Sequence, residues 1–376
     1  MPESRTQHCE TLVVGGGLVG SAIACGLAAR GNRVTLLDGA DNDLRASRGN
    51  FGLVWVQGKG DEFAAYARLT RVAAQLWSGF AAELEETTGV DVGLEQTGGY
   101  DFCLSQDEWD ARQLEMTRVA AHTNGEFEYA MLDNDELRRH IPQVSRDVLG
   151  ASYSAEDGHV NPLYLLRALH QRMAGLGVDY HADHPAHAVH ADGDGFVIDT
   201  ARQRFSCARV VLCAGLGNAT LGRDLGLALP LHPLRGQLLI TERVPRFLAA
   251  ATLQVRQTVE GTLQIGDSHE AVDLDDGTTL DVITRLAQRA VRIFPHLAGV
   301  RVNRAWGALR VMTPDGAPVY QPSPTHPGAW AVSCHSGVTL AALHARHLSD
   351  WIDGNEQVED MFLPFSSERF DVQAAG

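Results

Sequence analysis

The chain has 376 residues, 44% of them hydrophobic and 21% charged, and a formal net charge of −16 at pH 7. This composition is typical of a soluble globular protein, and the length favours two domains over one. The negative charge argues against nucleic acid as a partner and against electrostatic attraction to anionic lipid. A secretory signal peptide is not expected, because the acidic residues Glu3 and Glu10 stand where its basic region would be. The six cysteines show neither CxxC nor zinc spacing, so a reducing cytoplasm and no metal site are expected.

The most informative segment covers residues 12–38 and follows the order strand, glycine turn, helix, strand. Residues 12–14 form a short apolar run typical of a buried strand. The turn GGGLVG over 15–20 contains a GxGxxG pattern, and an alanine-rich, helix-favouring segment follows it. A second strand is predicted over 33–37 and leads directly into Asp38. This order is that of a nucleotide-binding βαβ unit.

Each part of this unit has a physical role. Gly15 permits the tight turn, Gly17 lets the backbone approach a pyrophosphate, and Gly20 permits close packing of helix on sheet. The N-terminus of the helix presents its N–H groups to the phosphates, and a carboxylate after the second strand can accept hydrogen bonds from a ribose. The alternative is a glycine-rich turn in another fold. The predicted cofactor contacts here are Gly15, Gly17, Leu18, Val19, Gly20 and Asp38.

A loop over 46–53, rich in small and polar residues, follows the ribose-binding acid. Its place in the chain is suited to a segment that lies along a cofactor, and an ordinary surface loop is the alternative. Its candidate cofactor contacts are Ser47, Arg48, Gly49 and Asn50.

Downstream, the pattern alternates between two kinds of segment. Helical periodicity over 62–88 predicts a structural helix. From about residue 89, a strand over 98–104 and helices over 107–122 and 133–142 carry no nucleotide motif, which predicts a second domain. A helix over 163–176, a strand over 178–181, a hairpin over 195–207 and an apolar strand over 208–215 indicate a return to the first domain. That strand ends in Ala214 and Gly215, whose small size lets backbone pack against a nucleotide.

The remaining elements are predicted in the same way. Strands over 230–241 and 262–266 and a helix over 281–294 are expected in the second domain. The segments 304–318 and 329–340 are expected to lead back to the first domain. A helix over 338–352 is expected to close it.

Four segments in this order resemble the FAD-dependent D-amino acid oxidase superfamily. They are GGGLVG at 15–20, VVLCAG at 210–215, WGALRVMTPDGAP at 306–318 and CHSGVTLA at 334–341. RGQLLITER at 235–243 is similar to the branch with hydrogen cyanide synthase, opine oxidase subunits and D-hydroxyproline dehydrogenase. The resemblance implies an α/β fold with two domains: a Rossmann-like FAD-binding domain and a substrate domain with a large antiparallel or mixed sheet.

The resemblance also implies domain limits and a reaction. The FAD-binding domain is expected to be discontinuous, over 1–90, 143–228 and 301–376, with the substrate domain over 91–142 and 229–300. The expected reaction is hydride transfer from the α-carbon of an amine to FAD, which gives an imine that water hydrolyses. The chain is therefore expected to be an enzyme, an FAD-dependent oxidoreductase acting on CH–NH or CH–NH2 donors.

The resemblance assigns roles to particular residues. Arg310 matches the family arginine that holds the substrate carboxylate, and a guanidinium suits this role because it pairs with a carboxylate through two oriented hydrogen bonds. An interdomain ion pair is the alternative. Gly337, Val338 and Thr339 match the start of the last helix, whose N–H groups would face the flavin. His335 is a candidate flavin contact, with a buried structural histidine as the alternative.

Departures from the family pattern carry information too. Ala308 takes the place of the flavin-linking cysteine of sarcosine oxidase, so FAD is expected to be non-covalent. The lysine that promotes the oxygen reaction there aligns with Gln264, which favours a dehydrogenase over a fast oxidase. Pocket side chains are expected around Gln254, Arg256 and Gln264.

Several functions stay open. The leading one is oxidation of a D-amino acid or secondary-amine acid, with cis-4-hydroxy-D-proline or D-proline as the best candidate. The alternatives are a glycine- or sarcosine-type oxidase that produces hydrogen peroxide, and a flavin-carrying subunit of an opine-oxidase-like complex without activity alone. The expected electron acceptor is a quinone, a carrier, a partner subunit or O2, and the oligomeric state stays open, with a homo- or hetero-oligomer among the alternatives. The inner membrane surface stays open as an alternative location.

Overall fold

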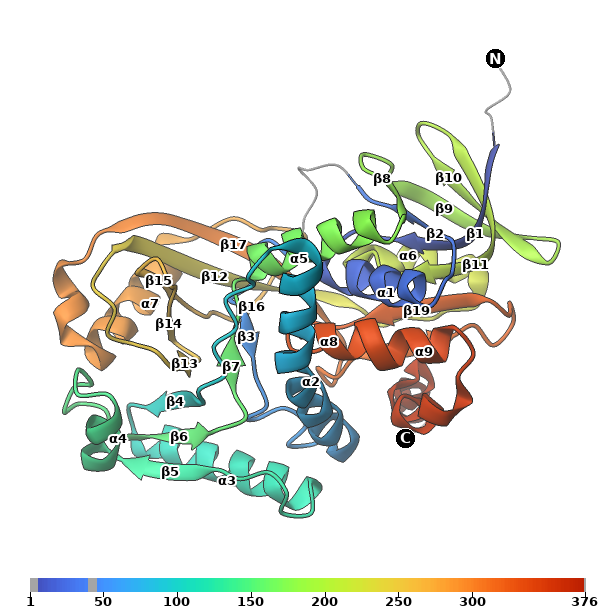
Figure 1. Ribbon diagram of the computed structural model, residues 1–376. Helices are drawn as coiled ribbons and strands as arrows, with labels where there is room; N and C mark the ends of the chain where they lie inside the picture. Colours follow the sequence, from blue (N-terminus) through green and yellow to red (C-terminus); the bar gives the residue numbers. More distant parts are fainter. Residues whose placement is uncertain (1–5, 40–45, 375–376) are drawn as a thin grey trace.

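The computed structural model describes residues 6–39 and 46–374, and Figure 1 shows them as two sheet-based parts. An eight-stranded sheet with flanking helices forms one part, at the right of the view. A five-stranded and a four-stranded sheet with their helices form the other, at the left. The long helix α2 (Ala64–Thr88) lies between them. No helix within the described ranges is long and apolar enough to cross a membrane.

The eight-stranded sheet has a parallel centre built from segments far apart in the sequence. Its main order is β18-β19-β11-β1-β2-β8, and the antiparallel strands β10 and β9 extend from β11. The neighbouring strands from β19 to β8 are parallel, whereas β18 is antiparallel to β19. The bounds are β1 (Thr6–Val14), β2 (Val34–Leu37), β8 (Asp179–His181), β9 (Ala186–Asp192), β10 (Gly195–Thr200), β11 (Arg204–Leu212), β18 (Val319–Pro322) and β19 (Ala329–Ser333).

Helices cover this sheet through small side chains. The helix α1 (Leu18–Ala29) is buried along nearly its whole length, and it contacts α5 (Pro162–Gly175) and the C-terminal helical segment. That segment comprises α8 (Ala341–Leu343), a π-helical turn (His344–Leu348) and α9 (Ser349–Ile352), so it begins three residues after the predicted position. A Cβ at Gly26 would overlap Ser349 and the Ala345 carbonyl, so glycine is what permits these helices to approach closely.

The second part combines two sheets over one apolar core. The five-stranded sheet has the order β14-β15-β12-β16, with β17 also paired to β12, and α7 (Leu280–Ile293) packs against it. The four-stranded sheet has the order β13-β4-β6-β5 and carries α3 (Gln106–His122) and α4 (Asn134–His140). Strand bounds are β4 (Gly99–Cys103), β5 (Ala130–Asp133), β6 (Gly150–Ser154), β12 (His232–Arg243), β13 (Ala251–Thr252), β14 (Val255–Gln257), β15 (Thr262–Ile265), β16 (Glu270–Ala271) and β17 (Val302–Met312).

The sheet pairing differs from the predicted domain limits at two places. Residues 143–154 were assigned to the first domain, but β6 pairs with β4 and β5 in the second part. Residues from 301 were also assigned to the first domain, but β17 pairs along its length with β12. The reason is that strand pairing joins segments distant in sequence, and local periodicity does not specify the partner.

A buried asparagine fastens the sheet beside α6 (Asn218–Leu221). The Asn218 side chain is fully buried, and its Oδ1 accepts the Ala214 N–H at 2.8 Å. Its Nδ2 donates to the carbonyls of Leu212 and Val332, both at 3.0 Å, and to the Ser333 hydroxyl at 2.9 Å. These bonds join the carboxyl ends of β11 and β19.

We expect Asn218→Leu to lower the free energy of unfolding by about 2–4 kcal/mol, because it leaves several buried backbone groups without partners. Chemical denaturation followed by circular dichroism measures this. Asn355→Ala is the control, since Asn355 caps an exposed turn through one bond to the Gln357 N–H, and we expect a loss of at most about 1 kcal/mol. Equal losses in the two variants would contradict the structural role of Asn218.

Candidate active site

Two adjoining cavities lie where the parts of the molecule meet. The nucleotide cavity, of about 620 Å³, lies at the carboxyl ends of β1, β2 and β11 and the N-terminus of α1. The substrate cavity, of about 370 Å³, lies between the loop after β3 (Leu53–Val54) and the face of β12 and β17. Both are lined by Ala46, Asn50, Leu309, Val311 and His335, so one opens into the other. Together they suit one long ligand and a small molecule at its end.

The nucleotide cavity is a cradle of backbone. Gly15 has a φ of 112°, and a Cβ there would overlap the Cys213 carbonyl oxygen. A Cβ on Gly17 would stand 2.8 Å from the Ser47 Oγ, which accepts the Leu18 N–H at 2.9 Å. The first turn of α1 has no acidic residue. Gly17, Leu18 and Val19 place this end of α1 at the cavity, and its positive charge suits the pyrophosphate of a dinucleotide.

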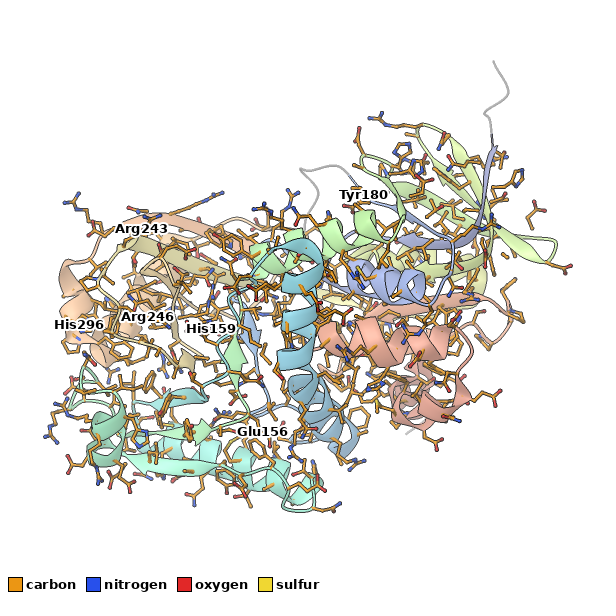
Figure 2. All side chains as sticks on the ribbon, viewed as in Figure 1. Glu156, His159, Tyr180, Arg243, Arg246 and His296 are labelled. Atoms are coloured by element: carbon orange, nitrogen blue, oxygen red, sulfur yellow. The ribbon has the colours of Figure 1, made fainter. Side chains whose placement is uncertain are left out.

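Asp38 ends β2 at the wall of this cavity, and its position is fixed by the backbone. Its Oδ1 accepts the N–H groups of Gly16 and Gly39, each at 3.0 Å, and its Oδ2 accepts the Tyr180 hydroxyl at 3.0 Å. Tyr180 is labelled in Figure 2 beside α5. His184 and His187 also line the cavity. No sequence motif pointed to these two histidines, because their approach to the cavity depends on the sheet.

The structure distributes the predicted cofactor residues over both cavities. Most line the nucleotide cavity: Gly15, Gly17, Leu18, Val19, Asp38, Ser47, Asn50, Ala214, Gly215 and Gly337. Others line the substrate cavity: Gly49, Asn50, Val338 and Thr339. Gly20 and Arg48 line neither cavity. A Cβ on Gly20 would overlap the Gly15 carbonyl oxygen, in keeping with its predicted packing role.

The substrate cavity has a sheet as one wall. From β12 the alternate residues Leu234, Gly236 and Leu238 line it, because side chains on a strand alternate between the two faces. From β17 the consecutive residues 308–312 line it, and two of them, Leu309 and Val311, also line the nucleotide cavity. Gly236 lies two residues from the partner of Arg310 in the register, and a Cβ there would stand 2.6 Å from the guanidinium. Glycine at this position leaves room for Arg310 to lie across β12.

Arg310 is paired with a carboxylate. Its guanidinium donates to Asp267 Oδ2 at 2.7 Å and to the Ser268 carbonyl at 2.8 Å. His269 Nε2 lies 3.8 Å from the same carboxylate. The cavity thus places a guanidinium where a carboxylate fits. Sequence reasoning found Arg310 but not Asp267, which reaches it from a different strand connection.

We expect Asp267→Asn to tighten the binding of a simple carboxylate such as propionate by about 3- to 10-fold, because a ligand carboxylate no longer competes with an ionised partner. Perturbation of the visible flavin spectrum on titration measures the dissociation constant. Asp273→Asn, at an exposed position just after β16, is the control. Weaker binding in Asp267→Asn would show that Asp267 supports the ligand instead.

Lys59 faces the same cavity, and sequence reasoning missed it. Its Nζ lies 2.8 Å from the His335 Nε2. Burial, followed by the positive charge of Arg310, lowers the pKa of Lys59 to about 8. Burial also holds the pKa of His335 well below its ordinary value, so this histidine is neutral at physiological pH. One observation in the sequence points to Lys59: it is the only lysine in the chain.

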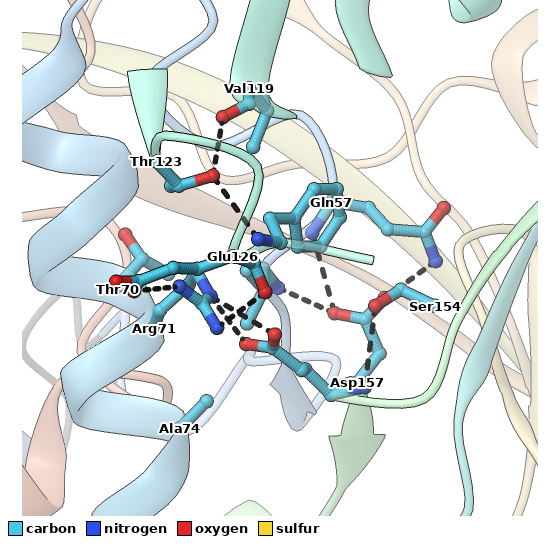
Figure 3. Close-up of polar contacts among 12 residues, drawn as sticks. Gln57, Thr70, Arg71, Ala74, Val119, Thr123, Glu126, Ser154 and Asp157 are labelled. Carbon is cyan, nitrogen blue, oxygen red and sulfur yellow. Dashed lines mark hydrogen bonds and ion pairs between the residues drawn. The ribbon is translucent and has the colours of Figure 1, made fainter. Parts of the chain in front are cut away.

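A buried polar network supports the loop that carries Lys59. Asp157 is fully buried and accepts hydrogen bonds from the Val56 N–H and from Gln57 Nε2, as Figure 3 shows for Gln57 and Asp157. The Gln57 Oε1 accepts hydrogen bonds from Arg112 and from the Ser152 hydroxyl. Because these groups come from separate elements, the loop is held on several sides.

The predicted pocket residues Gln254, Arg256 and Gln264 do not line the substrate cavity. Arg256 and Gln264 face each other across β14 and β15, with Arg256 Nε donating to Gln264 Oε1 at 2.8 Å. Arg256 also donates to the Val160 carbonyl at 2.9 Å, and its guanidinium lies 3.4 Å from the His159 Nδ1. Gln254 lines a neighbouring cavity and donates to Asp101. Cross-strand pairing directs the side chains of Arg256 and Gln264 to one another, whereas Gln254 is directed to Asp101.

Thr339, another predicted cofactor contact, also has a structural role. Its hydroxyl donates to the Leu53 carbonyl and accepts the Trp55 N–H, both at 3.1 Å, and its carbonyl accepts the Trp77 Nε1–H at 3.0 Å. Thr339 therefore connects the turn after β19 to the loop that leads to Lys59.

No cluster of three or more metal-ligating side chains occurs within the described part of the chain.

A parallel sheet with a glycine cradle, next to a polar cavity with an arginine, defines a dinucleotide-dependent oxidoreductase. Comparison with known proteins gives the family. The model for the FAD dependent oxidoreductase family, DAO, matches residues 10–351, and the chain belongs to this family. FAD is its cofactor, and the cradle at Gly15 and Gly17 with the positive end of α1 fits that group.

Individual proteins similar to this chain agree with the family assignment. An opine oxidase subunit of Agrobacterium tumefaciens (strain Ach5) is 42% identical over 96% of this chain and 98% of that protein. Glycine oxidase of Geobacillus kaustophilus (strain HTA426) is 27% identical over 97% of this chain and 98% of that protein. A crystal structure of glycine oxidase from Geobacillus kaustophilus superposes with a TM-score of 0.84 and 24% identity, covering 93% of this chain and 96% of that one.

Proposed function

We propose that this protein oxidises a carboxylated secondary amine at the carbon between the amine and the carboxylate, as the flavin-carrying subunit of a heteromeric enzyme. The observation that carries the proposal is the Arg310 guanidinium, paired with a carboxylate in a cavity that adjoins the nucleotide cavity. In this proposal a substrate carboxylate replaces Asp267 on Arg310. Bidentate pairing with a planar guanidinium would then fix the orientation of the α-carbon.

The residues of this chain divide the work between the two cavities. The glycine turn, Asp38 and the loop at Ser47 would hold FAD, which supplies the hydride acceptor. Arg310 would hold the substrate. The apolar wall formed by Leu234, Leu238 and Met312 would exclude water from the reacting carbon. The product would be an imine, which water hydrolyses after release.

The subunit role rests on the 42% identity with the opine oxidase subunit over nearly both whole chains. N-(1-carboxyethyl) amino acids, D-proline and cis-4-hydroxy-D-proline are all carboxylated secondary amines, the substrate class proposed above. The second candidate is an oxidase that acts alone on glycine or sarcosine, and the 27% identity with glycine oxidase favours it.

The choice of electron acceptor was linked to the residue beside the flavin. The preference for a dehydrogenase rested on a neutral Gln264 beside the flavin, and Gln264 lies outside the substrate cavity. We propose a second, different chain of the same enzyme as the acceptor, on the similarity to the opine oxidase subunit.

We also propose that the eight-stranded sheet and its helices form the FAD-binding domain, with the other two sheets as the substrate domain.

The test is anaerobic mixing of the purified FAD-loaded chain with a panel of amines, alone and after co-purification with its partner chain. The panel contains an N-(1-carboxyethyl) amino acid, D-proline, cis-4-hydroxy-D-proline, glycine and sarcosine. We expect a secondary amine to bleach the flavin, and slow recolouring in air. Bleaching by glycine alone with fast recolouring would favour the oxidase. No bleaching by any amine, with or without the partner, would overturn the proposal.

A further inference from the structure

We propose that Lys59 is the proton acceptor of this site: its neutral amine takes the proton from the substrate ammonium before the α-carbon is oxidised. The inference rests on the proposed function, because it requires an amine substrate bound at Arg310. It assigns a catalytic role to a residue outside the family pattern discussed above.

The position of Lys59 is the first support. Lys59 lies in the turn that precedes α2 and lines the substrate cavity together with Arg310, Asp267, His269 and His335. A substrate whose carboxylate pairs with Arg310 would therefore have its amine in a cavity that Lys59 also lines. The loop is held by the Asp157 and Gln57 network, so its position is defined without a ligand.

The choice of amino acid is the second support. Every other one of the 31 Lys and Arg residues in the chain is an arginine. Arginine is the better residue for a fixed positive charge and for pairing with carboxylates, but it does not release its proton in proteins. A lysine can do so once it is desolvated. The ability to release a proton is thus what lysine offers and arginine lacks, and the chain has its single lysine at this position.

The third support comes from the ion pairs of the site. None of the ion pairs identified within residues 6–39 and 46–374 involves Lys59. The nearby acids are engaged elsewhere: Glu115 pairs with Arg112, and Asp267 pairs with Arg310. The close partner of Lys59 is the neutral His335. A lysine that is not ion-paired in a half-buried site is easier to deprotonate.

The charges that face Lys59 act in both directions. Burial and Arg310 on β17 disfavour its ammonium form, whereas Asp267, Glu115 on α3 and the Cys334 thiol favour it, and the balance lowers its pKa to about 8. His269 faces the same cavity, and burial lowers its pKa as well. A group whose pKa lies near the working pH can accept and release a proton efficiently.

Hydrogen bonds orient the amine. Burial lowers the pKa of His335, and a hydrogen bond with the Gly316 backbone opposes this in part. The His335 Nε2 lies 2.8 Å from the Lys59 Nζ, and it accepts a proton of Lys59 in the tautomer that carries its hydrogen on Nδ1. The Ser336 hydroxyl lies 3.2 Å from the same Nε2 and 2.8 Å from the buried Tyr66 hydroxyl. With one N–H directed to His335, the lone pair of a neutral Lys59 is free to point elsewhere in the cavity.

The chemistry balances in two steps. An N–H bond of the substrate ammonium breaks, its proton binds the Lys59 Nζ, and its electron pair stays on the substrate nitrogen. That lone pair can then form the C=N bond as the α-hydrogen leaves with its electron pair, for which bound FAD would be the acceptor. Without the first step no lone pair exists, so a protonated amine does not react. Lys59 returns its proton to solvent when the product leaves.

The single lysine permits a direct measurement that does not depend on turnover. The FAD-loaded chain is prepared with lysine labelled by ¹⁵N at Nζ, and its NMR resonance is followed with pH. We expect the pH titration of the Lys59 resonance to have its midpoint near 8. The variant Arg33→Lys adds an exposed reference lysine, whose titration should have its midpoint at about 10.4. A Lys59 midpoint equal to the reference would overturn the proposal.

The kinetic test uses variants of Lys59. In anaerobic bleaching by the substrate found above, with the partner chain if it is needed, the wild-type rate should rise with pH through about 8. Lys59→Met and Lys59→Arg should each bleach about 10²- to 10⁴-fold more slowly, as expected for loss of a general base. Added methylamine should restore part of the rate of Lys59→Met.

Two results would overturn the proposal in this test. Retention of rate in Lys59→Arg would make Lys59 a fixed cation, and an unchanged rate in Lys59→Met would remove it from the reaction. Propionate binding, read from the flavin spectrum, should stay within about 3-fold in Lys59→Met if Arg310 is the carboxylate anchor. A wild-type chain that no amine bleaches would instead refute the proposed function, and the NMR midpoint would still be measured.

Discussion

We expect Arg310→Ala to bind FAD with an unchanged visible spectrum and to be bleached by the substrate about 10²- to 10³-fold less efficiently at low substrate concentration. Loss of a buried charge pair of this kind costs about 2–5 kcal/mol. Arg310 lines the substrate cavity and not the nucleotide cavity, which is why the two effects separate. The measurement is stopped-flow absorbance under anaerobic conditions, with flavin content determined in parallel.

Arg304→Ala is the matched control for this variant. Arg304 lies on the same strand, β17, but it is exposed, lies over the Trp306 ring at 5.5 Å and does not line the substrate cavity. Arg304→Ala should therefore be bleached at the wild-type rate. Arg310→Lys should recover only part of the loss, because a lysine does not form the bidentate pair. If Arg310→Ala and Arg304→Ala behave alike, Arg310 does not hold the substrate.

The second large effect concerns the glycine turn. We expect Gly15→Ala to be purified without FAD, because its Cβ would overlap the Cys213 carbonyl oxygen and displace the turn from the phosphates. A left-handed φ adds a further cost of about 1–2 kcal/mol for a residue with a side chain. Flavin absorbance after purification and titration with added FAD measure the effect.

The contribution of steric overlap can be separated from that of backbone strain. Gly31 also has a positive φ, of 91°, but a Cβ there would have no heavy atom within 4 Å. Gly31→Ala should lose stability to a similar extent through strain and still bind FAD. Equal loss of FAD in both variants would mean that general destabilisation, and not the geometry of the turn, removes the cofactor.

The local part of the fold could be predicted from sequence. The predicted helix over 107–122 corresponds to α3, where the hydroxyl of the N-cap residue Ser105 accepts the Glu108 N–H. The long helix over 62–88 corresponds to α2, which ends at a left-handed Gly89. These features depend on residues three or four positions apart, so a short stretch of sequence is enough to predict them.

Long-range pairing was the part that sequence patterns could not specify. The pairing of β6 with β4 and of β17 with β12 joins segments that the predicted domain limits had placed in different domains. The separate pairing of β14 with β15 sets Arg256 and Gln264 opposite each other, and neither lines the substrate cavity. Strand register and partner depend on contacts across the whole chain, and a single sequence without homologues does not encode them in any readable pattern.

The sequence by itself determined the nucleotide-binding unit and the family, because a glycine turn between strand and helix has a geometry that few residue types can adopt. It also singled out Arg310. Only the tertiary structure decided what surrounds that arginine: Asp267 as its partner, and Lys59 beside His335 in the same cavity. The reason is physical, since charge, burial and hydrogen bonding at a site are properties of groups that folding brings together from distant parts of the chain.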